Sequence, residues 1–93
     1  MKKLIICIDY DDTFSAIPEL LTDFIIAAKK KGHRIIGATM RYEHEGIPKE
    51  FRKLCDQIFF TKRKAKLPFL MAQKIFPDIW IDDKPMWILN DAQ

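Results

Sequence analysis

The sequence predicts a three-layer α/β domain built on a parallel sheet, and two features of the chain lead to this fold class. Short apolar runs with almost no polar alternation recur along the chain, as expected of strands that are covered on both faces. These runs are Leu4–Ile8, Ile35–Ala38, Ile58–Phe60 and Ile79–Ile81. Segments with helical periodicity separate them, so strands and helices alternate, which indicates right-handed crossovers with helices on both faces of the sheet.

The first helix is expected between Pro18 and Gly32, because proline is favoured in a first turn and glycine just after a last turn. Lys29–Lys31 fall in its last turn, where the helix dipole favours cations, so we interpret them as part of the helix rather than as a binding patch. Apolar residues at helical spacing form a stripe that is expected to face the core. The stripe consists of Leu20, Leu21, Phe24, Ile25 and Ala28.

Two shorter helices and one further apolar run are expected in the second half of the chain. The second helix is predicted to begin at Pro48, and the third to begin near Pro68 and to stop at Pro77. A last short run, Trp87–Leu89, is a candidate fifth strand at the edge of the sheet. The residues expected to face the core are Phe51, Leu54 and Cys55 in the second helix, and Leu67, Leu70, Met71 and Ile75 in the third.

The composition narrows the class of protein. A chain of 93 residues has room for one domain over residues 1–93, and 48% hydrophobic residues with a net charge of +3 argue against disorder. No apolar run approaches the roughly 18–20 residues of a membrane span, and Asp9 interrupts the N-terminal run too early for a signal peptide. Cys7 and Cys55 sit in apolar segments, which indicates reduced, buried thiols and a cytoplasmic location.

Carboxylates gather at the ends of two predicted strands. Asp9 and Asp11 follow the first run at a spacing that places both on one face of extended backbone, and Asp82 and Asp83 follow the fourth run. Ligands of parallel sheets bind beyond the carboxyl ends of the strands, so these side chains meet if the two strands are neighbours. Such a cluster stays ionised only beside a cation, and oxygen ligands select a hard divalent ion such as Mg²⁺. No cysteine or histidine lies at a strand end, which argues against zinc.

Two further polar side chains accompany the carboxylates. Thr39 ends the second run, and Lys66 closes the basic segment that follows the third run. A hydroxyl and an ammonium beside a carboxylate–Mg²⁺ centre make a pocket for a dianionic group such as phosphate. An aspartate can act as the nucleophile of phosphoryl transfer and form an aspartyl-phosphate.

Four ordered motifs resemble those of the haloacid dehalogenase (HAD) superfamily of phosphotransferases. They are Asp9-x-Asp11-x-Thr13 after a strand, Thr39 at the end of the next strand, Lys66 before the last helix, and Asp82-Asp83 after the following strand. The resemblance spans residues 4–83 and implies a Rossmann-like α/β/α fold with strand order of about 3-2-1-4-5. The chain looks like a minimal member without a cap domain, because the segments after Thr13 and between Thr39 and Lys66 are too short to hold one.

The resemblance also implies roles for individual residues in a Mg²⁺-dependent phosphatase. Asp9 would be the nucleophile, and Asp11 would be the general acid/base that protonates the leaving oxygen and then activates water. Thr39 would bind the phosphoryl group, and Lys66 would neutralise the phosphate and the nucleophile. The Mg²⁺ ligands would be Asp9, the backbone carbonyl of Asp11, Asp82 and Asp83.

Several alternatives stay open at this point. Lys62 and Lys64 compete with Lys66, and Arg41 either binds substrate or is solvated. The phosphorylated substrate can be a small molecule, with a second copy of the chain closing the site. It can also be a nucleic-acid end or a phosphoprotein that closes the site itself. The alternative function is a low-activity module of the same fold that binds phosphate or nucleic acid through the basic segment 62–66.

Overall fold

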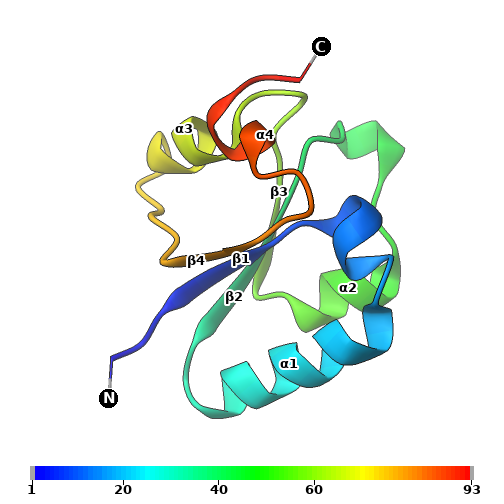
Figure 1. Cartoon of the computed structure of the whole chain (residues 1–93), viewed down its shortest axis with the longest axis vertical. Helices are drawn as coiled ribbons and strands as arrows, with labels where there is room; N and C mark the ends of the chain where they lie inside the picture. The colour runs from blue at the N-terminus through cyan, green and yellow to red at the C-terminus, as the bar shows by residue number, and fades with distance from the viewer. Residues whose placement is uncertain (1, 93) are drawn as a thin grey trace.

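In the computed structural model, which describes residues 2–92, the strands form a parallel four-stranded sheet (Figure 1). Their order across the sheet is β3-β2-β1-β4. The strands are β1 (Ile5–Ile8), β2 (Arg34–Thr39), β3 (Gln57–Phe60) and β4 (Ile79–Ile81). All four coincide with the apolar runs of the sequence, so the α/β class and the parallel sheet are confirmed.

The expected fifth strand is wrong. The run Trp87–Leu89 belongs to a short helix, α4 (Met86–Leu89). Pro85, with φ of −58°, starts a helical turn, and the amides of Trp87 and Ile88 bond to carbonyls three residues back (both 3.0 Å). Within residues 2–92 the sheet therefore ends at β4, and the expected order 3-2-1-4-5 becomes 3-2-1-4.

Helices cover both faces of the sheet. Figure 1 shows α1 (Pro18–Lys30) and α2 (Lys49–Leu54) on one side, with α3 (Lys66–Met71) and α4 on the other. Neighbouring residues of a strand point to opposite faces, and two apolar clusters result. The first contains Ile6, Ile8, Phe14, Leu21, Ile25, Ala28, Ile35, Phe51 and Cys55, and the second Cys7, Ile36, Ala38, Phe59 and Leu70.

Three residues expected in the core are exposed. Leu20 and Phe24 of α1 have 64% and 37% of their surface accessible, and Met71 at the end of α3 has 46%. In α1 the buried positions are Leu21, Ile25 and Ala28, which form a narrow stripe at spacings of four and three. A helix that packs on one sheet and has no second neighbour on its outer side leaves the adjacent apolar positions in solvent.

The third helix is shorter than expected. α3 covers Lys66–Met71, so it begins before Pro68 and ends well before Pro77. Lys74 has φ of +62°, which helical backbone excludes, and the next amide bonds back to the carbonyl of Leu70 (3.0 Å). The chain turns at Lys74 and reaches β4 through an extended segment, in which Pro77 lies. By contrast, α1 ends as expected at a glycine, Gly32, with φ of +90°.

The parallel register brings the carboxyl ends of three strands to one edge of the sheet. Ile8 at the end of β1 lies beside Gly37 of β2 and Ile81 of β4. The amide of Asp9 continues the ladder by bonding to the carbonyl of Ile81 (2.9 Å). The residues that follow β1 and β4 therefore emerge side by side, with the end of β2 on the other flank.

The two cysteines are free thiols that lie in clusters on opposite faces of the sheet. Burial raises the pKa of Cys55 to about 12, so this thiol is protonated and unreactive at neutral pH.

Among residues 2–92, no helix has both the length and the apolarity that crossing a membrane requires.

Gly37 in the middle of β2 permits a close approach of α2 to the sheet. A Cβ at this position would lie 2.7 Å from the ring of Phe51 and 2.7 Å from the side chain of Ile58. Phe51 is 1% exposed and anchors α2 in the first apolar cluster. The absence of a side chain at Gly37 is therefore what allows the Phe51 ring to rest on the strand.

We expect Gly37→Ala to lower the free energy of unfolding by about 1–3 kcal/mol, because the added methyl overpacks the Phe51 contact. Urea unfolding at neutral pH measures this change. A Phe51→Leu background, which shortens the side chain that the methyl meets, should reduce the penalty of Gly37→Ala. Simple additivity of the two substitutions would contradict the close-approach explanation.

Candidate active site

Directly after β1 the chain makes one wide helical turn, η1 (Tyr10–Phe14), which was not expected from the sequence. The amide of Phe14 bonds to the carbonyl of Asp9 (3.2 Å), which closes the turn over the end of the strand. Inside the turn Asp12 adopts a left-handed φ of 59°, a conformation that aspartate tolerates better than most residues. The turn holds the side chain of Asp9 at the sheet edge and starts the chain toward α1.

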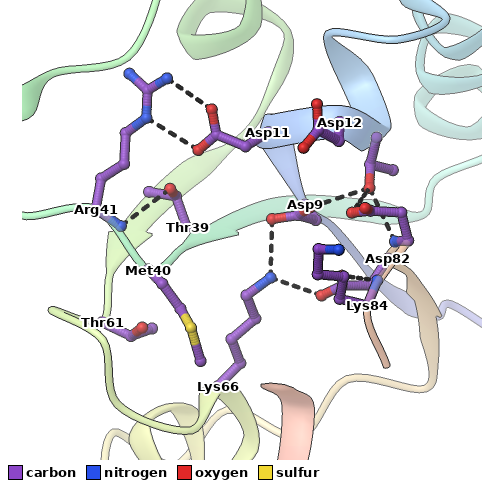
Figure 2. A network of polar contacts seen from close by, with 12 residues as sticks. Asp9, Asp11, Asp12, Thr39, Met40, Arg41, Thr61, Lys66, Asp82 and Lys84 are labelled. Atoms are coloured by element: carbon purple, nitrogen blue, oxygen red, sulfur yellow. Dashed lines mark hydrogen bonds and ion pairs between the residues drawn. The ribbon is translucent and has the colours of Figure 1, made fainter. Parts of the chain in front are cut away.

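A buried lysine bridges two carboxylates at this edge. The Nζ of Lys66, which is 2% exposed, donates hydrogen bonds to Asp9 Oδ1 (2.8 Å) and Asp82 Oδ2 (2.6 Å). Figure 2 shows the ammonium between the two aspartates. Lys66 is the first residue of α3, so its ammonium connects the ends of β1 and β4 to a helix on the second face of the sheet.

The two competing lysines lie elsewhere. Lys62 and Lys64 are exposed and form long ion pairs with Glu43 (3.9 Å) and Asp91 (3.8 Å). Neither contacts Asp9 or Asp82, so the structure distinguishes Lys66 from both. Lys66 is separated from Lys62 and Lys64 because the start of α3 is fixed by a backbone hydrogen bond. Asp91 Oδ1 accepts this bond from the amide of Ala65 (2.7 Å).

Thr13 connects Asp9 to Asp83, a contact that was not expected from the sequence. Its hydroxyl lies 3.0 Å from Asp9 Oδ2 and 2.8 Å from Asp83 Oδ1, and it accepts a hydrogen bond from the Asp83 amide (3.0 Å). A hydroxyl has one hydrogen, so it satisfies only one of the two carboxylates at a time. The other carboxylate oxygen remains available to a different donor or to a cation.

Three carboxylates come close enough to share one ion. Asp9, Asp82 and Asp83 each offer an oxygen within 4.8 Å of the others, a donor set that suits a hard divalent cation. If all three are ionised beside one protonated Lys66, the cluster has a net charge of −2. The three aspartates therefore suit a divalent cation, because they offer oxygen ligands and because their net charge together with Lys66 is −2.

Thr39 and Arg41 mark the end of β2. Thr39 is 1% exposed, and its hydroxyl accepts a hydrogen bond from the amide of Arg41 (3.2 Å). The Arg41 guanidinium forms a two-point pair with the Asp11 carboxylate, at 3.0 Å from Nε and 2.7 Å from Nη2. Asp11 consequently points toward Arg41 and away from Asp9 (Figure 2), although their spacing predicted that the two side chains project together.

Two adjoining cavities open at this edge. A small one of about 70 Å³ is lined by Asp9, Asp11, Asp12, Met40, Lys66, Asp83, Lys84 and Trp87. A larger one of about 400 Å³ is lined by Asp11, Met40, Arg41, Glu45, Arg63, Trp87 and Ala92. Asp11, Met40 and Trp87 belong to both walls, so the cavities are neighbours. Neither Thr39 nor Asp82 lines either cavity.

Residues after β4 contribute to these walls in a way that sequence reasoning missed. Trp87 lines both cavities, and Ala92 of the same C-terminal segment bonds through its amide to the carbonyl of Arg63 (2.8 Å). The signal in the sequence was weak, because the run around Trp87 resembles a strand as much as a helix. The segment thus forms part of the wall of both cavities through Trp87, and of the larger one through Ala92.

Burial and charge compete at the centre of the site. Burial raises the pKa of Asp9 to about 6, although Lys66 and the Thr13 hydroxyl both draw it down. Burial lowers the pKa of Lys66, but Asp9 and Asp82 outweigh this effect and hold it above its ordinary value. Burial raises the pKa of Asp83, but hydrogen bonding, chiefly with Thr13, outweighs this effect and holds the pKa below its usual range. A neutral pH therefore favours charged Lys66 and Asp83, with Asp9 the group nearest to titration.

Comparisons with family models, with curated proteins and with solved structures find no match for this chain. The resemblance to the HAD superfamily therefore depends on the motif residues alone.

The raised pKa of Asp9 predicts a pH-dependent stability in metal-free protein. Folded Asp9 keeps its proton up to about pH 6, whereas an ordinary aspartate releases it near 3.8, so the folded state loses stability as pH rises through this window. Asp9→Asn lacks this titration. Its free energy of unfolding, relative to wild type, should rise by about 3 kcal/mol between about pH 4 and about pH 7.5.

Urea unfolding in EDTA at the two pH values measures this difference. Asp23→Asn, an exposed carboxylate of α1, controls for the loss of one negative charge. A constant difference between Asp9→Asn and wild type at both pH values would contradict the assignment of a raised pKa to Asp9.

Proposed function

We propose that the protein is a Mg²⁺-dependent phosphomonoester phosphatase that works through an aspartyl-phosphate on Asp9. One observation carries the proposal: the Asp9 carboxylate lies in the wall of a small cavity, bonded to the buried Lys66 ammonium (2.8 Å). A carboxylate beside a fixed cation, at the carboxyl edge of a parallel sheet, is arranged to meet a phosphate. The four motifs that resemble those of the HAD superfamily, and their order along the chain, also support the proposal.

In the first step Asp9 attacks the phosphorus of the ester and the bond to the leaving oxygen breaks. One Asp9 oxygen forms the new P–O bond, and the Lys66 ammonium offsets the charge of the transferring group. Asp11, which lines the same cavity, donates a proton to the leaving oxygen so that the product departs as an alcohol. This step leaves Asp9 phosphorylated and Asp11 ionised.

In the second step water hydrolyses the aspartyl-phosphate. The ionised Asp11 takes a proton from the attacking water, whose oxygen bonds to phosphorus while the P–O bond to Asp9 breaks. Asp9 returns to a carboxylate that Lys66 and Thr13 hold in place. Lys66 is the donor to the phosphoryl oxygens in this proposal, and Thr39, which is outside the wall of the small cavity, keeps this role only as an expectation from the sequence.

Asp9, Asp82 and Asp83 would hold the Mg²⁺ ion, together with the backbone carbonyl of Asp11. A bound Mg²⁺ supplies charge stabilisation to the phosphoryl oxygens. The net charge of −2 on the cluster and the spacing of its oxygens support this assignment. The Thr13 hydroxyl, which can serve only one of Asp9 and Asp83, leaves an oxygen free for such an ion.

The alternative function is a module that binds nucleic acid through the basic segment 62–66. The cations of this segment already have acidic partners, which makes this function less favoured than the phosphatase. Arg63 pairs with Glu45 (3.2 Å), and Lys62, Lys64 and Lys66 also have acidic partners. Cations that are already paired release fewer counterions on meeting a polyanion. We therefore retain the phosphatase as the leading function.

Three substitutions test the phosphatase directly on an aryl phosphate with Mg²⁺. Asp9→Asn should lower kcat at least ~10³-fold because the nucleophile is lost, and Asp11→Asn about 10²–10⁴-fold because the general acid is lost. Lys66→Met should cost about 10²–10³-fold. Lys64→Met, an exposed neighbour, is the matched control and should keep full activity.

Turnover that is independent of metal, or that survives Asp9→Asn, would refute this function. Circular dichroism of each variant separates loss of catalysis from loss of folding. Acid-quenched Asp9 phosphate, detected by mass spectrometry of the peptide that contains it, would report the intermediate itself.

Mg²⁺ binding can be measured without catalysis. The ion should raise the melting temperature of the wild-type protein, because it binds only the folded cluster. Asp83→Asn should weaken Mg²⁺ affinity at least about tenfold in isothermal titration calorimetry, since one oxygen donor is lost. Asp83 is exposed, so its substitution leaves the buried Lys66–Asp82 pair intact, and Asp23→Asn serves as the control. Equal affinities of Asp83→Asn and wild type would contradict the ligand assignment.

A further inference from the structure

The larger cavity beside the carboxylates is not used by the reaction described above. It has a volume of about 400 Å³, within the range of small-ligand pockets, and shares Asp11, Met40 and Trp87 with the small cavity. A phosphate ester whose phosphoryl group enters the small cavity would extend its other end into this space. The larger cavity is thus the place where the leaving group of a substrate would lie.

The Arg41 guanidinium in this cavity is held by groups other than Asp11. Its Nη1 donates to the carbonyl of Gly46 (3.0 Å), and its Cζ lies over the Tyr10 ring, 5.4 Å from the ring centroid. Only 28% of the Arg41 side chain is exposed. The fork of Nε and Nη2 is therefore fixed in place before any ligand arrives.

Asp11, which occupies that fork, is the replaceable member of the pair. Its side chain is 50% exposed, and within residues 2–92 both of its oxygens bond to Arg41 alone. In this position Asp11 faces Arg41 rather than Asp9 (Figure 2). The same carboxylate cannot stay on the fork and also reach an ester oxygen above Asp9.

The charges of the larger cavity leave room for one further anion. Arg41 and Arg63 contribute two positive charges, and Asp11 and Glu45 contribute two negative charges. Glu45 stays with Arg63, to which it is bonded (3.2 Å). If Asp11 leaves the fork, the remaining wall has one uncompensated positive charge, and one carboxylate or phosphate of a ligand restores neutrality with the same two-point geometry.

On the basis of the proposed phosphatase function, we infer that the substrate is a small phosphate ester that carries a second oxyanion. This second oxyanion binds Arg41 in the larger cavity and replaces Asp11 on the guanidinium fork. The freed Asp11 carboxylate takes up a proton from solvent and then reaches the leaving oxygen. Arg41 is thus a specificity residue that also positions the general acid. The apolar parts of Met40 and Trp87 cover the carbon frame between the two anions.

Arg41 keeps an anionic partner throughout this exchange. One oxyanion leaves the fork as another arrives, so the guanidinium is never buried without a partner, and the cost of the exchange is small. A neutral leaving group makes no such exchange and leaves Asp11 on Arg41. The second anion should therefore raise kcat as well as lower KM.

A matched series of esters tests the inference. The probes are phosphooxy-alkanoic acids of increasing chain length, each compared with its neutral amide, and the corresponding bisphosphates test phosphate against carboxylate as the second anion. At the best length, the acid or bisphosphate should exceed the amide in kcat/KM by about 10- to 100-fold, the range expected for a charge-assisted hydrogen-bonded pair. Equal kcat/KM for acid, bisphosphate and amide at every length would overturn the inference, as would preference for a 5′-phosphorylated oligonucleotide over all of them.

Variants separate the two roles of Arg41. Arg41→Gln should bring the acid-to-amide ratio close to one, and Arg41→Lys should keep only part of the preference because it lacks the two-point fork. Arg52→Gln, whose guanidinium lies over Phe60 elsewhere, is the matched control and should keep the wild-type ratio. In Asp11→Asn the acid should keep its KM advantage and lose its kcat advantage. An unchanged ratio in Arg41→Gln would overturn the inference.

A binding experiment separates failure of this inference from failure of the proposed function. Non-hydrolysable phosphonate analogues of the best acid and its amide are titrated into the wild-type protein with Mg²⁺ by calorimetry. Affinity for the acid at least about tenfold above the amide supports the inference even if no ester is turned over, and equal affinity refutes it. Absence of turnover with every ester, by contrast, refutes the phosphatase alone.

Discussion

The buried ammonium of Lys66 is the interaction on which the site depends. It joins the ends of β1 and β4 through Asp9 (2.8 Å) and Asp82 (2.6 Å), and it reaches them from α3 on the second face of the sheet. Both carboxylates are almost fully buried, so removing the lysine would leave two unpaired charges in a poorly solvated place. The position of α3, and with it the wall of the small cavity, follows from this pairing.

The positive charge of Lys66 does not balance the negative charges of the carboxylates around it. One ammonium faces three carboxylates, and the Thr13 hydroxyl can satisfy only one of Asp9 and Asp83. Burial, assisted by the negative charge of Asp82, lifts the pKa of Asp9 to about 6 although Lys66 and Thr13 draw it down. A divalent cation would remove this imbalance and keep Asp9 ionised as a nucleophile, so the features that destabilise the metal-free cluster are those that a metal-dependent phosphatase would use.

Much of the fold could be predicted because apolar runs and strand burial are two descriptions of one constraint. A strand covered on both faces has no polar alternation, so the runs marked all four strands. Leu20, Phe24 and Trp87–Leu89 were misassigned for a related reason. Periodicity shows which residues can be buried, whereas burial depends on whether a neighbouring element covers them, and within residues 2–92 no element covers Leu20 or Phe24 of α1.

The sequence by itself determined which chemical groups stand at the strand ends, because a residue that follows an apolar run in a parallel sheet must emerge at the carboxyl edge. Asp9, Thr39 and Asp82 were found in this way, whereas Lys66 was chosen because it precedes the helix predicted near Pro68. Only the tertiary structure decided which of them touch. It selected Lys66 over Lys62 and Lys64, gave Thr13 its bridging position, and turned Asp11 onto Arg41. These contacts join residues from separate elements, and their distances depend on how helices pack and turns bend, which local sequence does not encode.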